Sequence, residues 1–508
     1  MKIVYLPLDE RPCNYIYPQM IADIRSNVEL IAPPREMLGT KKTPADTDKL
    51  WEWLQTAVVG ADKLVVSLEQ LVYGGLLPSR LHHERVETLL ARLGRLEAIK
   101  SINSDIEILA ACLIMRTPTY SSSEEEPDYY QEFGNDIFRW GWLNDKTERE
   151  GLSAAETSEL GQIIARLPKE PLDDYCERRR KNIEINKAAI GLTDSGVIDF
   201  LSIPQDDSAP YGFTAIDQKT IVSEVVGRRL QPRVHMYPGA DEVGCTLLVR
   251  CIAYKYRPLK IFPFYSAVNA ANVIALYEDR PLGECLKAHI LAAGCLVADS
   301  PEQADIILAI NAPGKFMMES ASQFAKDITY SSYRNLREFV MRISDYVADG
   351  YQVAVADVAF CNGGDHELVQ MLDDAGMLDE ITAYAGWNTN CNTTGTVIAT
   401  AIFAYEDSRG KEIVRNKIYH LLEGWAYQGV IRQEMIVDFL PQYGASYFVM
   451  NGFDEEINRE TEHRLERFWY ANIRNSFIDW EIERLTVWRP WRRMFEIGVK
   501  FDLFYKKY

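Results

Sequence analysis

The chain has 508 residues, with 55 Lys and Arg against 74 Asp and Glu, so its formal net charge is −19. This charge disfavours nucleic acids and anionic membranes as partners, because both attract clustered Lys and Arg. The most basic stretch, residues 178–181, is flanked by Asp173, Asp174, Glu177 and Glu184. We interpret it as a solvated helix face and expect neither kind of partner.

Composition and cysteine usage indicate an ordinary globular protein. The chain is 47% hydrophobic and 25% charged, which excludes disordered, collagen-like and coiled-coil classes. No stretch approaches the roughly 18 apolar residues of a membrane span, and the N-terminal apolar run is too short for a signal peptide. Nine scattered cysteines without a CxxC pair favour neither a disulfide framework nor a zinc ribbon. We therefore expect a cytoplasmic protein.

Short β-branched apolar runs alternate with helical periodicity along most of the chain, which is typical of βα units. The eight clearest runs are residues 2–8, 63–68, 106–115, 198–204, 234–237, 259–265, 353–358 and 381–385, and two further runs are residues 28–31 and 305–310. Eight parallel strands fit a closed (β/α)8 TIM-like barrel, which is our prediction. Ten strands could equally form two doubly wound sheets.

Two segments depart from this alternation. Residues 120–196 carry only helical patterns, so they predict a helical insertion after the third strand that would cap the mouth of a barrel. From about residue 405 the βα rhythm stops, and a helical stretch at 411–437 precedes apolar alternation from Phe495 to Leu503. We predict a (β/α)8-like catalytic domain over residues 1–404 and a helical/β C-terminal subdomain over residues 405–508.

Polar and aromatic residues follow nearly every apolar run. In parallel α/β proteins the carboxyl ends of the strands meet at one edge, where functional sites form. Helix capping or turn formation explains any one of these residues, but not the recurrence of carboxylates, arginines and aromatic rings. We predict one acidic pocket whose substrate-binding residues are Asp9, Arg11, Glu69, Tyr73, Arg116, Tyr120, Tyr211, Asn269, Asp357, Asn362, Trp387 and Asn388.

Two adjacent acidic pairs supply the candidate catalytic residues, Asp206 with Asp207 and Asp241 with Glu242. Like charges in one pocket raise the pKa of at least one carboxyl, which can then act as an acid beside a base. Glycoside hydrolysis needs such a pair. The sequence therefore predicts a hydrolase, a glycosidase acting on a small oligosaccharide or glycoside.

The Asp206–Asp207 pair also looks like the dyad of barrel hexosaminidases, which use the substrate's own acetamido group as nucleophile. Retaining, inverting and substrate-assisted routes therefore all stay open. The oligomeric state is open as well, with a homo-oligomer as one option.

Two other function classes compete with the glycosidase. Clustered carboxylates could hold Mg²⁺ or Ca²⁺ in a metal-dependent hydrolase or lyase, and the same pocket could belong to a non-catalytic sugar-binding protein. Seven histidines without HxH or HExxH disfavour a zinc hydrolase. The chain also lacks GxGxxG, Walker A and GxSxG motifs. We expect no metal and no cofactor.

Several motifs together resemble one bacterial family. They are LPLDERPCN, SLEQLVYGGLLPSR, PQDDSAPYG, PGADEVG, YEDRPL and AYAGWNTNCNTTGT. In combination they are similar to the family catalogued as domain of unknown function 4127, over nearly the whole chain. The resemblance implies a single enzyme-like module and brings no established activity with it.

Overall fold

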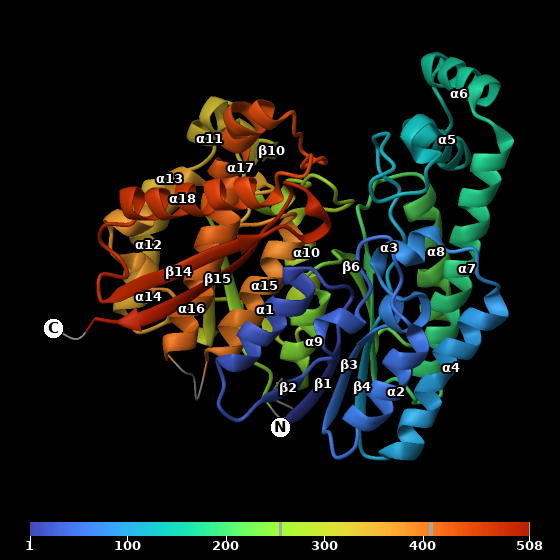
Figure 1. Ribbon diagram of the computed structural model, residues 1–508, viewed down its shortest axis with the longest axis horizontal. Coiled ribbons are helices and arrows are strands. Elements are labelled where there is room, and N and C mark those ends of the chain that lie inside the picture. Colours follow the sequence, from blue (N-terminus) through green and yellow to red (C-terminus); the bar gives the residue numbers. More distant parts are fainter. Residues whose placement is uncertain (253–256, 406–409, 507–508) are drawn as a thin grey trace. The chain divides into compact units, whose positions relative to one another are not determined.

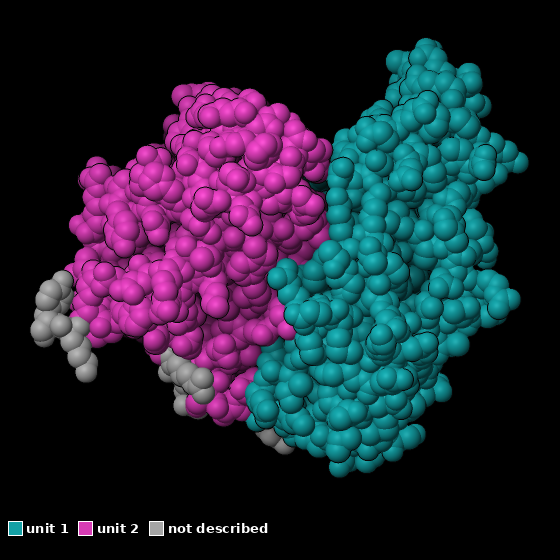
Figure 2. All heavy atoms as spheres, in the orientation of Figure 1, with its two compact units in different colours: residues 1–10, 29–247, 277–279 teal, residues 11–28, 248–276, 280–508 magenta. Residues whose placement is uncertain are grey.

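The computed structural model describes residues 1–252, 257–405 and 410–506. It has an α/β fold with two larger parallel sheets, and the chain divides into two compact units (Figure 2). Unit 1 comprises residues 1–10, 29–247 and 277–279, and unit 2 comprises residues 11–28, 248–276 and 280–508.

Unit 1 is built on a six-stranded parallel sheet. Its strands are β1 (Lys2–Leu6), β2 (Glu29–Ile31), β3 (Lys63–Ser67), β4 (Glu107–Ala111), β5 (Phe200–Gln205) and β6 (Val234–Pro238). Every residue of β5 is buried, as expected where helices cover both faces of a sheet. The order β2-β1-β3-β4-β5-β6 reverses its winding direction between β1 and β3. In doubly wound sheets, ligands bind beyond the carboxyl ends of the strands at such a reversal.

Helices connect these strands and include the predicted insertion. The helical elements are η1 (Arg35–Met37), α2 (Thr47–Ala57), the π-helical turn η2 (Glu69–Tyr73), α3 (Leu76–Leu81), α4 (Val86–Ile102), α5 (Tyr130–Arg149), α6 (Ala154–Arg166), α7 (Lys169–Asp194) and α8 (Phe213–Gly227). Helix α9 (Val243–Ile252) begins in unit 1 and ends in unit 2. The insertion consists of α5, α6 and α7, with α5 and α6 together at one end of the long α7 (Figure 1).

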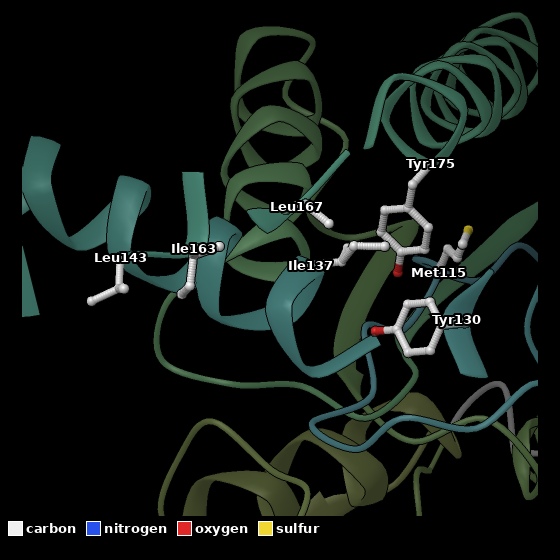
Figure 3. Packing of buried hydrophobic residues seen from close by; sticks show 7 residues of the cluster. All are labelled: Met115, Tyr130, Ile137, Leu143, Ile163, Leu167 and Tyr175. Atoms are coloured by element: carbon white, nitrogen blue, oxygen red, sulfur yellow. The ribbon is translucent and has the colours of Figure 1, made fainter. Parts of the chain in front are cut away.

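The insertion has a hydrophobic core of its own. Its buried members are Met115, Tyr130, Ile137, Leu143, Ile163, Leu167 and Tyr175 (Figure 3). The rings of Tyr130 and Tyr175 lie near Met115, with their centroids 5.7 Å apart. Each hydroxyl donates to a backbone oxygen at 2.9 Å, that of Tyr175 to Arg116 and that of Tyr130 to Pro118. This core therefore fixes the segment that leaves β4.

Only part of the basic stretch on α7 is the solvated face that we predicted. The side chains of Arg178 and Arg179 are 2% and 3% exposed, whereas Arg180 is largely exposed. Arg178 pairs with Asp174, and Arg179 pairs with Asp217 on α8. A buried guanidinium needs such a carboxylate. Arg179 thereby joins α7 to α8, whereas the Arg178 pair lies within α7.

Unit 2 is built on a five-stranded parallel sheet. Its strands are β7 (Lys260–Tyr265), β8 (Leu296–Val297), β9 (Ile306–Asn311), β11 (Gln352–Asp357) and β13 (Ala383–Ala385). Read from its other edge, the order is β8-β7-β9-β11-β13, which repeats the order of the first five strands of unit 1. The winding direction accordingly reverses between β7 and β9.

The remaining elements of unit 2 cover and extend this sheet. The α-helices are α1 (Pro12–Asp23), α10 (Leu282–Ala292), α11 (Thr329–Ser332), α12 (Leu336–Ala348), α13 (His366–Asp374), α14 (Met377–Glu380), α15 (Asn390–Phe403), α16 (Gly410–His420), α17 (Arg432–Glu434) and α18 (Asp454–Asn472). Two π-helical segments are η6 (Leu421–Ile431) and η7 (Met435–Phe439), and the 3-10 turns are η3 (Ala270–Asn272), η4 (Pro301–Gln303), η5 (Ser320–Ala325), η8 (Leu440–Tyr443) and η9 (Pro490–Arg492).

Two small sheets complete unit 2. Strands β10 (Met318–Glu319) and β12 (Phe360–Cys361) form a parallel pair, and β14 (Trp480–Trp488) and β15 (Gly498–Tyr505) form an antiparallel pair. The apolar alternation predicted near the C-terminus falls largely on β15. None of the described helices combines the length and the apolar character needed to cross a bilayer.

The prediction of one closed barrel is wrong, although all ten apolar runs become strands. They divide between two sheets, and in the described residues neither sheet closes on itself. The two runs that we held as extra, now β2 and β9, cause the difference: β2 forms an edge of the first sheet and β9 lies in the middle of the second. The alternative of two doubly wound sheets is the one that forms.

The division into units also differs from the boundary predicted at residue 404. Helix α16 and the π-helical segment η6 pack on β13, and η6 also packs on α13 and α18. The chain beyond residue 410 therefore completes unit 2 instead of forming a subdomain of its own.

Candidate functional site

A group of six charged side chains in unit 1 lies beyond the carboxyl ends of β4 and β5. We call it the arginine–carboxylate cluster, and it consists of Arg80, Arg116, Glu125, Glu126, Asp206 and Asp207. Arg80 lies on α3, and Arg116 follows β4. The two glutamates lie in the loop before α5, and the two aspartates follow β5 directly.

Arg116 holds three carboxylates at once. Its Nε donates to Glu126 at 2.8 Å, its Nη2 to Glu125 at 2.8 Å, and its Nη1 to Asp207 at 3.1 Å. Tyr175 fixes the Arg116 backbone through its hydroxyl. Because a guanidinium is planar and always charged, this arrangement aligns the three carboxylates around one plane.

Arg80 holds the other member of the aspartate pair. Its Nη2 forms a close ion pair with Asp206, and its Nη1 lies 3.4 Å from both Glu125 and Glu126. The side chain of Arg80 is 3% exposed, and its Nε has no hydrogen-bond partner among the described residues. Asp206 and Asp207 are thus adjacent in sequence, but each pairs with a different arginine.

Asp207 combines a strained backbone with a perturbed carboxyl. Its φ is +39°, in the left-handed region that non-glycine residues seldom adopt. Burial raises the pKa of the Asp207 carboxyl to about 6; the charge of Asp206 adds to the rise, and that of Arg116 opposes it. Since 24% of the side chain stays exposed, solvent limits this shift. A fraction of Asp207 is therefore protonated near neutral pH.

Glu69 begins the π-helical turn η2 just beyond β3 and is 3% exposed. Its Oε1 accepts from the backbone N–H of Leu113 at 2.7 Å, and its Oε2 accepts from the Ser67 hydroxyl at 3.0 Å. Burial nevertheless raises the pKa of Glu69 to about 7. π-Helical turns are rare and occur frequently at functional sites.

A cavity of about 10 Å³ lies inside unit 1. This is about the space that one water molecule needs, and it is far smaller than a ligand pocket. Its walls are formed by Glu69, Tyr73, Leu76, Ser79, Arg80, Cys112, Leu113, Met115, Asn182, Asn186 and Asp206. Because Asn182 and Asn186 lie on α7, the insertion contributes to this wall at the carboxyl end of the sheet.

A larger, open hollow of about 630 Å³ also belongs to unit 1. It is lined by Lys42, Leu81, His83, Pro127, Asp128, Tyr129, Glu170, Pro171, Asp174 and Arg178. Pro127 directly follows Glu126, and Leu81 directly follows Arg80, so the hollow shares two chain segments with the arginine–carboxylate cluster. Its volume falls in the usual range for small-molecule sites.

The other predicted residues of unit 1 are not members of the arginine–carboxylate cluster, although the Gly239 N–H before Asp241 donates to Gln205 O at 3.0 Å, next to the aspartate pair. Asp9 is buried after β1, whereas Tyr120 is 45% exposed. Tyr211 packs edge-on against Trp142 of α5, with ring centroids 5.0 Å apart. Asp241 and Glu242 are buried before α9, and Glu242 Oε2 accepts from the backbone N–H of Ala240 at 3.1 Å.

Unit 2 contains a second buried polar group, at the carboxyl ends of β9, β11 and β13. Asp357 accepts from Asn311 Nδ2 at 2.8 Å, from the Asp365 N–H at 2.7 Å and from the Tyr384 hydroxyl at 2.9 Å. Arg334 forms an ion pair with Asp365. Burial raises the pKa of Asp357 to about 7, and the charge of Asp365 adds to the rise.

The remaining predicted residues of unit 2 are spread over several elements. Arg11 stacks on Trp491 at 4.5 Å from the ring centroid, and Asn269 is exposed beside η3. Asn362 donates to Glu319 at 2.8 Å. Trp387 is 2% exposed, and Asn388 has a φ of +51°.

Because no barrel forms, the predicted candidates do not share one barrel mouth. Unit 1 brings together Glu69, Tyr73, Arg116, Asp206 and Asp207, while Asp357 belongs to the polar group of unit 2. Within each sheet, polar residues that follow different strands therefore gather at the carboxyl edge.

Sequence reasoning missed several members of these groups. They are Arg80, Glu125 and Glu126 in unit 1, and Asn311, Arg334, Asp365 and Tyr384 in unit 2; the buried Glu423, outside both groups, was missed as well. Glu125 and Glu126 stand in a run of three glutamates that is typical of a solvated loop. Glu423 is buried in η6, accepts from the Tyr17 hydroxyl at 3.1 Å, and has a pKa raised by burial to about 7. Asp365 was the member that the sequence signalled most clearly, because it belongs to the polar segment Asn362–Asp365 that follows a predicted strand.

A metal ion at the arginine–carboxylate cluster would compete with guanidinium groups. All four carboxylates of the cluster already face Arg80 or Arg116. One oxygen of each carboxylate is engaged by a guanidinium, so Mg²⁺ or Ca²⁺ would have to compete with two arginines for these side chains.

The chain has one clear relationship to known proteins. No curated protein matches it. A family model described as a protein of unknown function, DUF4127, matches residues 3–500, in agreement with the resemblance of the sequence motifs. The chain therefore belongs to the DUF4127 family.

Proposed function

We propose that the protein is a glycoside hydrolase that uses Asp206 and Asp207 for acid/base catalysis on a small oligosaccharide or glycoside. Asp207 supplies the proton to the leaving glycosidic oxygen. Asp206, as a carboxylate, takes a proton from the attacking water. Arg80 and Arg116 orient the two groups.

One observation carries this proposal, the different environments of two adjacent carboxyls. Asp206 forms a close ion pair with Arg80, whereas burial raises the pKa of Asp207 to about 6. Two carboxyls whose environments differ in this way can divide the acid and base roles. The hollow beside Tyr129 offers the space, the carboxylates and the aromatic face that sugar binding needs.

A substrate-assisted route also fits the pair. In this route Asp206 orients the acetamido group of a 2-acetamido sugar, which attacks the anomeric carbon, and Asp207 protonates the leaving group. Substrates with and without this group separate the two routes. We expect no cofactor, and the nine free cysteines fit a cytoplasmic location.

The decisive experiment is a screen of aryl glycosides and oligosaccharides with and without EDTA. We expect hydrolysis that EDTA leaves unchanged. Loss of activity with EDTA and its return with Mg²⁺ or Ca²⁺ would favour the metal-dependent hydrolase or lyase. Binding without turnover would favour a sugar-binding protein.

Asp207→Asn then tests the acid. We expect a rate loss of about 10²- to 10⁴-fold on natural substrates and a smaller loss on aryl glycosides whose leaving groups need no protonation. Asp199→Asn is the matched control, because Asp199 pairs with Lys100 at the amino end of the same sheet. Near-native turnover by Asp207→Asn on a natural substrate would remove Asp207 from the acid role.

A further inference from the structure

The cavity inside unit 1 is polar as well as small. Five of the residues that line it carry a carboxyl, guanidinium or hydroxyl side chain, namely Glu69, Asp206, Arg80, Tyr73 and Ser79. Empty cavities of this size are normally apolar, whereas polar cavities hold a water with two to four hydrogen-bond partners. At about 10 Å³ there is space for one water molecule only.

The wall also presents an unused donor. Within the part of the chain that the structure describes, Arg80 Nε is buried without a hydrogen-bond partner, although Nη1 and Nη2 of the same side chain face carboxylates. A buried N–H of a charged group that lacks an acceptor is costly. Asp206 uses its Oδ2 for Arg80, which leaves Oδ1 to accept another hydrogen bond.

The Glu69 carboxyl complements this arrangement. Its Oε1 is held as an acceptor by the Leu113 N–H. The backbone N–H of Leu113 is a fixed donor, so the proton of a protonated Glu69 belongs on Oε2, which becomes a donor and keeps a lone pair for the Ser67 hydroxyl. A water that accepts from Arg80 Nε and from Glu69 Oε2 can donate to Asp206 Oδ1.

We infer that the cavity binds one structural water that links Glu69 and Arg80 Nε to Asp206, and that Glu69 acts through this water as a positioning residue for the Asp206 carboxylate. The presence of the water is inferred from the size and polarity of the cavity alone, whereas its effect on catalysis rests on the proposed function. No proton needs to move along this link. In its protonated form Glu69 donates to the water without releasing its proton, and Asp206 keeps the orientation that proton abstraction requires.

A pair of substitutions at Glu69 separates positioning from proton donation. Glu69→Gln keeps an acceptor for Leu113 and a donor toward the water, so we expect kcat within about threefold of the wild type. Glu69→Leu removes both groups, and we expect kcat to fall about 10- to 100-fold with KM nearly unchanged, because Asp206 loses its orientation. Equal losses in both variants would mean that Glu69 transfers its own proton, which overturns the positioning role.

A third variant removes the water without touching an ionisable group. Ser79→Thr adds one methyl group to the cavity wall and keeps the hydroxyl that donates to Leu76 O at 2.6 Å. We expect this variant to show the same kcat loss as Glu69→Leu. Ser195→Thr is its control, because Ser195 makes the same kind of bond, to Leu192 O at 3.1 Å, on the surface.

Crystal structures of the full chain give a readout that does not depend on activity. We expect one ordered water between Glu69, Arg80 and Asp206 in the wild type and in Glu69→Gln, and none in Ser79→Thr. A dry wild-type cavity would overturn the inference. If the water is present but no glycoside is cleaved, the proposed function fails while the water site stands. If Ser79→Thr loses the water and keeps full kcat, the catalytic link is refuted.

Discussion

At the scale of single residues, the raised pKa of Asp207 predicts how activity depends on pH. A general acid works only when protonated, so kcat/KM should fall as pH rises through about 6. Aryl glycosides with leaving groups that need no protonation should lack this alkaline limb. Rate profiles from pH 4 to 9 on both substrate types check the prediction. An identical limb for both would assign it to a group other than the acid.

Asp357 in unit 2 predicts a pH dependence of stability instead. Its pKa is raised from 3.8 to about 7 in the folded protein, so between these values the folded state binds more protons than the unfolded state. Its contribution to the unfolding free energy is therefore complete below pH 4 and decreases as pH rises toward 7. Asp357→Asn should flatten this part of the stability profile, because asparagine has no proton to lose.

Urea unfolding between pH 4 and 8 measures this difference. Glu69 and Glu423 also have a pKa raised to about 7. The slope of unfolding free energy against pH should therefore be smaller in Asp357→Asn than in the wild type, but not zero. Asp349→Asn, at an exposed position after α12, should keep the wild-type slope. A slope for Asp357→Asn as steep as that of the wild type would show that Asp357 ionises without cost in the folded protein.

At the scale of elements, the helical insertion depends on its own core. Ile163 is 1% exposed and belongs to that core, whereas its neighbour Ile164 is 61% exposed on the same helix. Ile163→Ala should lower the unfolding free energy by about 2–5 kcal/mol. Ile164→Ala should change it by less than about 0.5 kcal/mol.

Limited proteolysis shows where the first of these variants opens. In Ile163→Ala we expect faster cleavage within residues 120–196. Since the Tyr175 hydroxyl donates to the Arg116 backbone oxygen, we also expect Arg116 to be less firmly positioned. Equal protease resistance of the two variants would contradict a separate core.

At the scale of the whole molecule, the net charge of −19 predicts that the protein does not bind nucleic acid. The α7 basic stretch does not change this expectation, because Arg178, Arg179 and Arg180 all pair with carboxylates. Fluorescence anisotropy with labelled DNA and RNA at 50 and 150 mM salt should show no binding at micromolar protein. Binding that weakens steeply with salt would reveal a basic surface that the charge balance hides.

The sequence by itself determined which segments become strands and where polar chemistry gathers along the chain. All ten apolar runs are strands, because burial on both faces of a parallel sheet requires continuous apolar residues. The aspartate pair directly follows β5, and Asp357 is the last residue of β11. Their positions at the carboxyl edges of the sheets therefore follow from where each strand ends in the sequence. The sequence also predicted the helical insertion, since helical periodicity depends on residues only three and four positions apart.

Only the tertiary structure decided how the strands pair and which charges meet. A parallel strand can pair with any other strand of similar length and hydrophobicity, so the choice between one barrel and two sheets depends on contacts between segments far apart in the chain. Arg80 reaches Asp206 from a helix, and Glu125 and Glu126 reach Arg80 and Arg116 from a loop, although neither segment carries a local sign of these contacts. Their meeting follows from the folded sheet, because a charge can be buried only where folding brings it a partner of opposite sign.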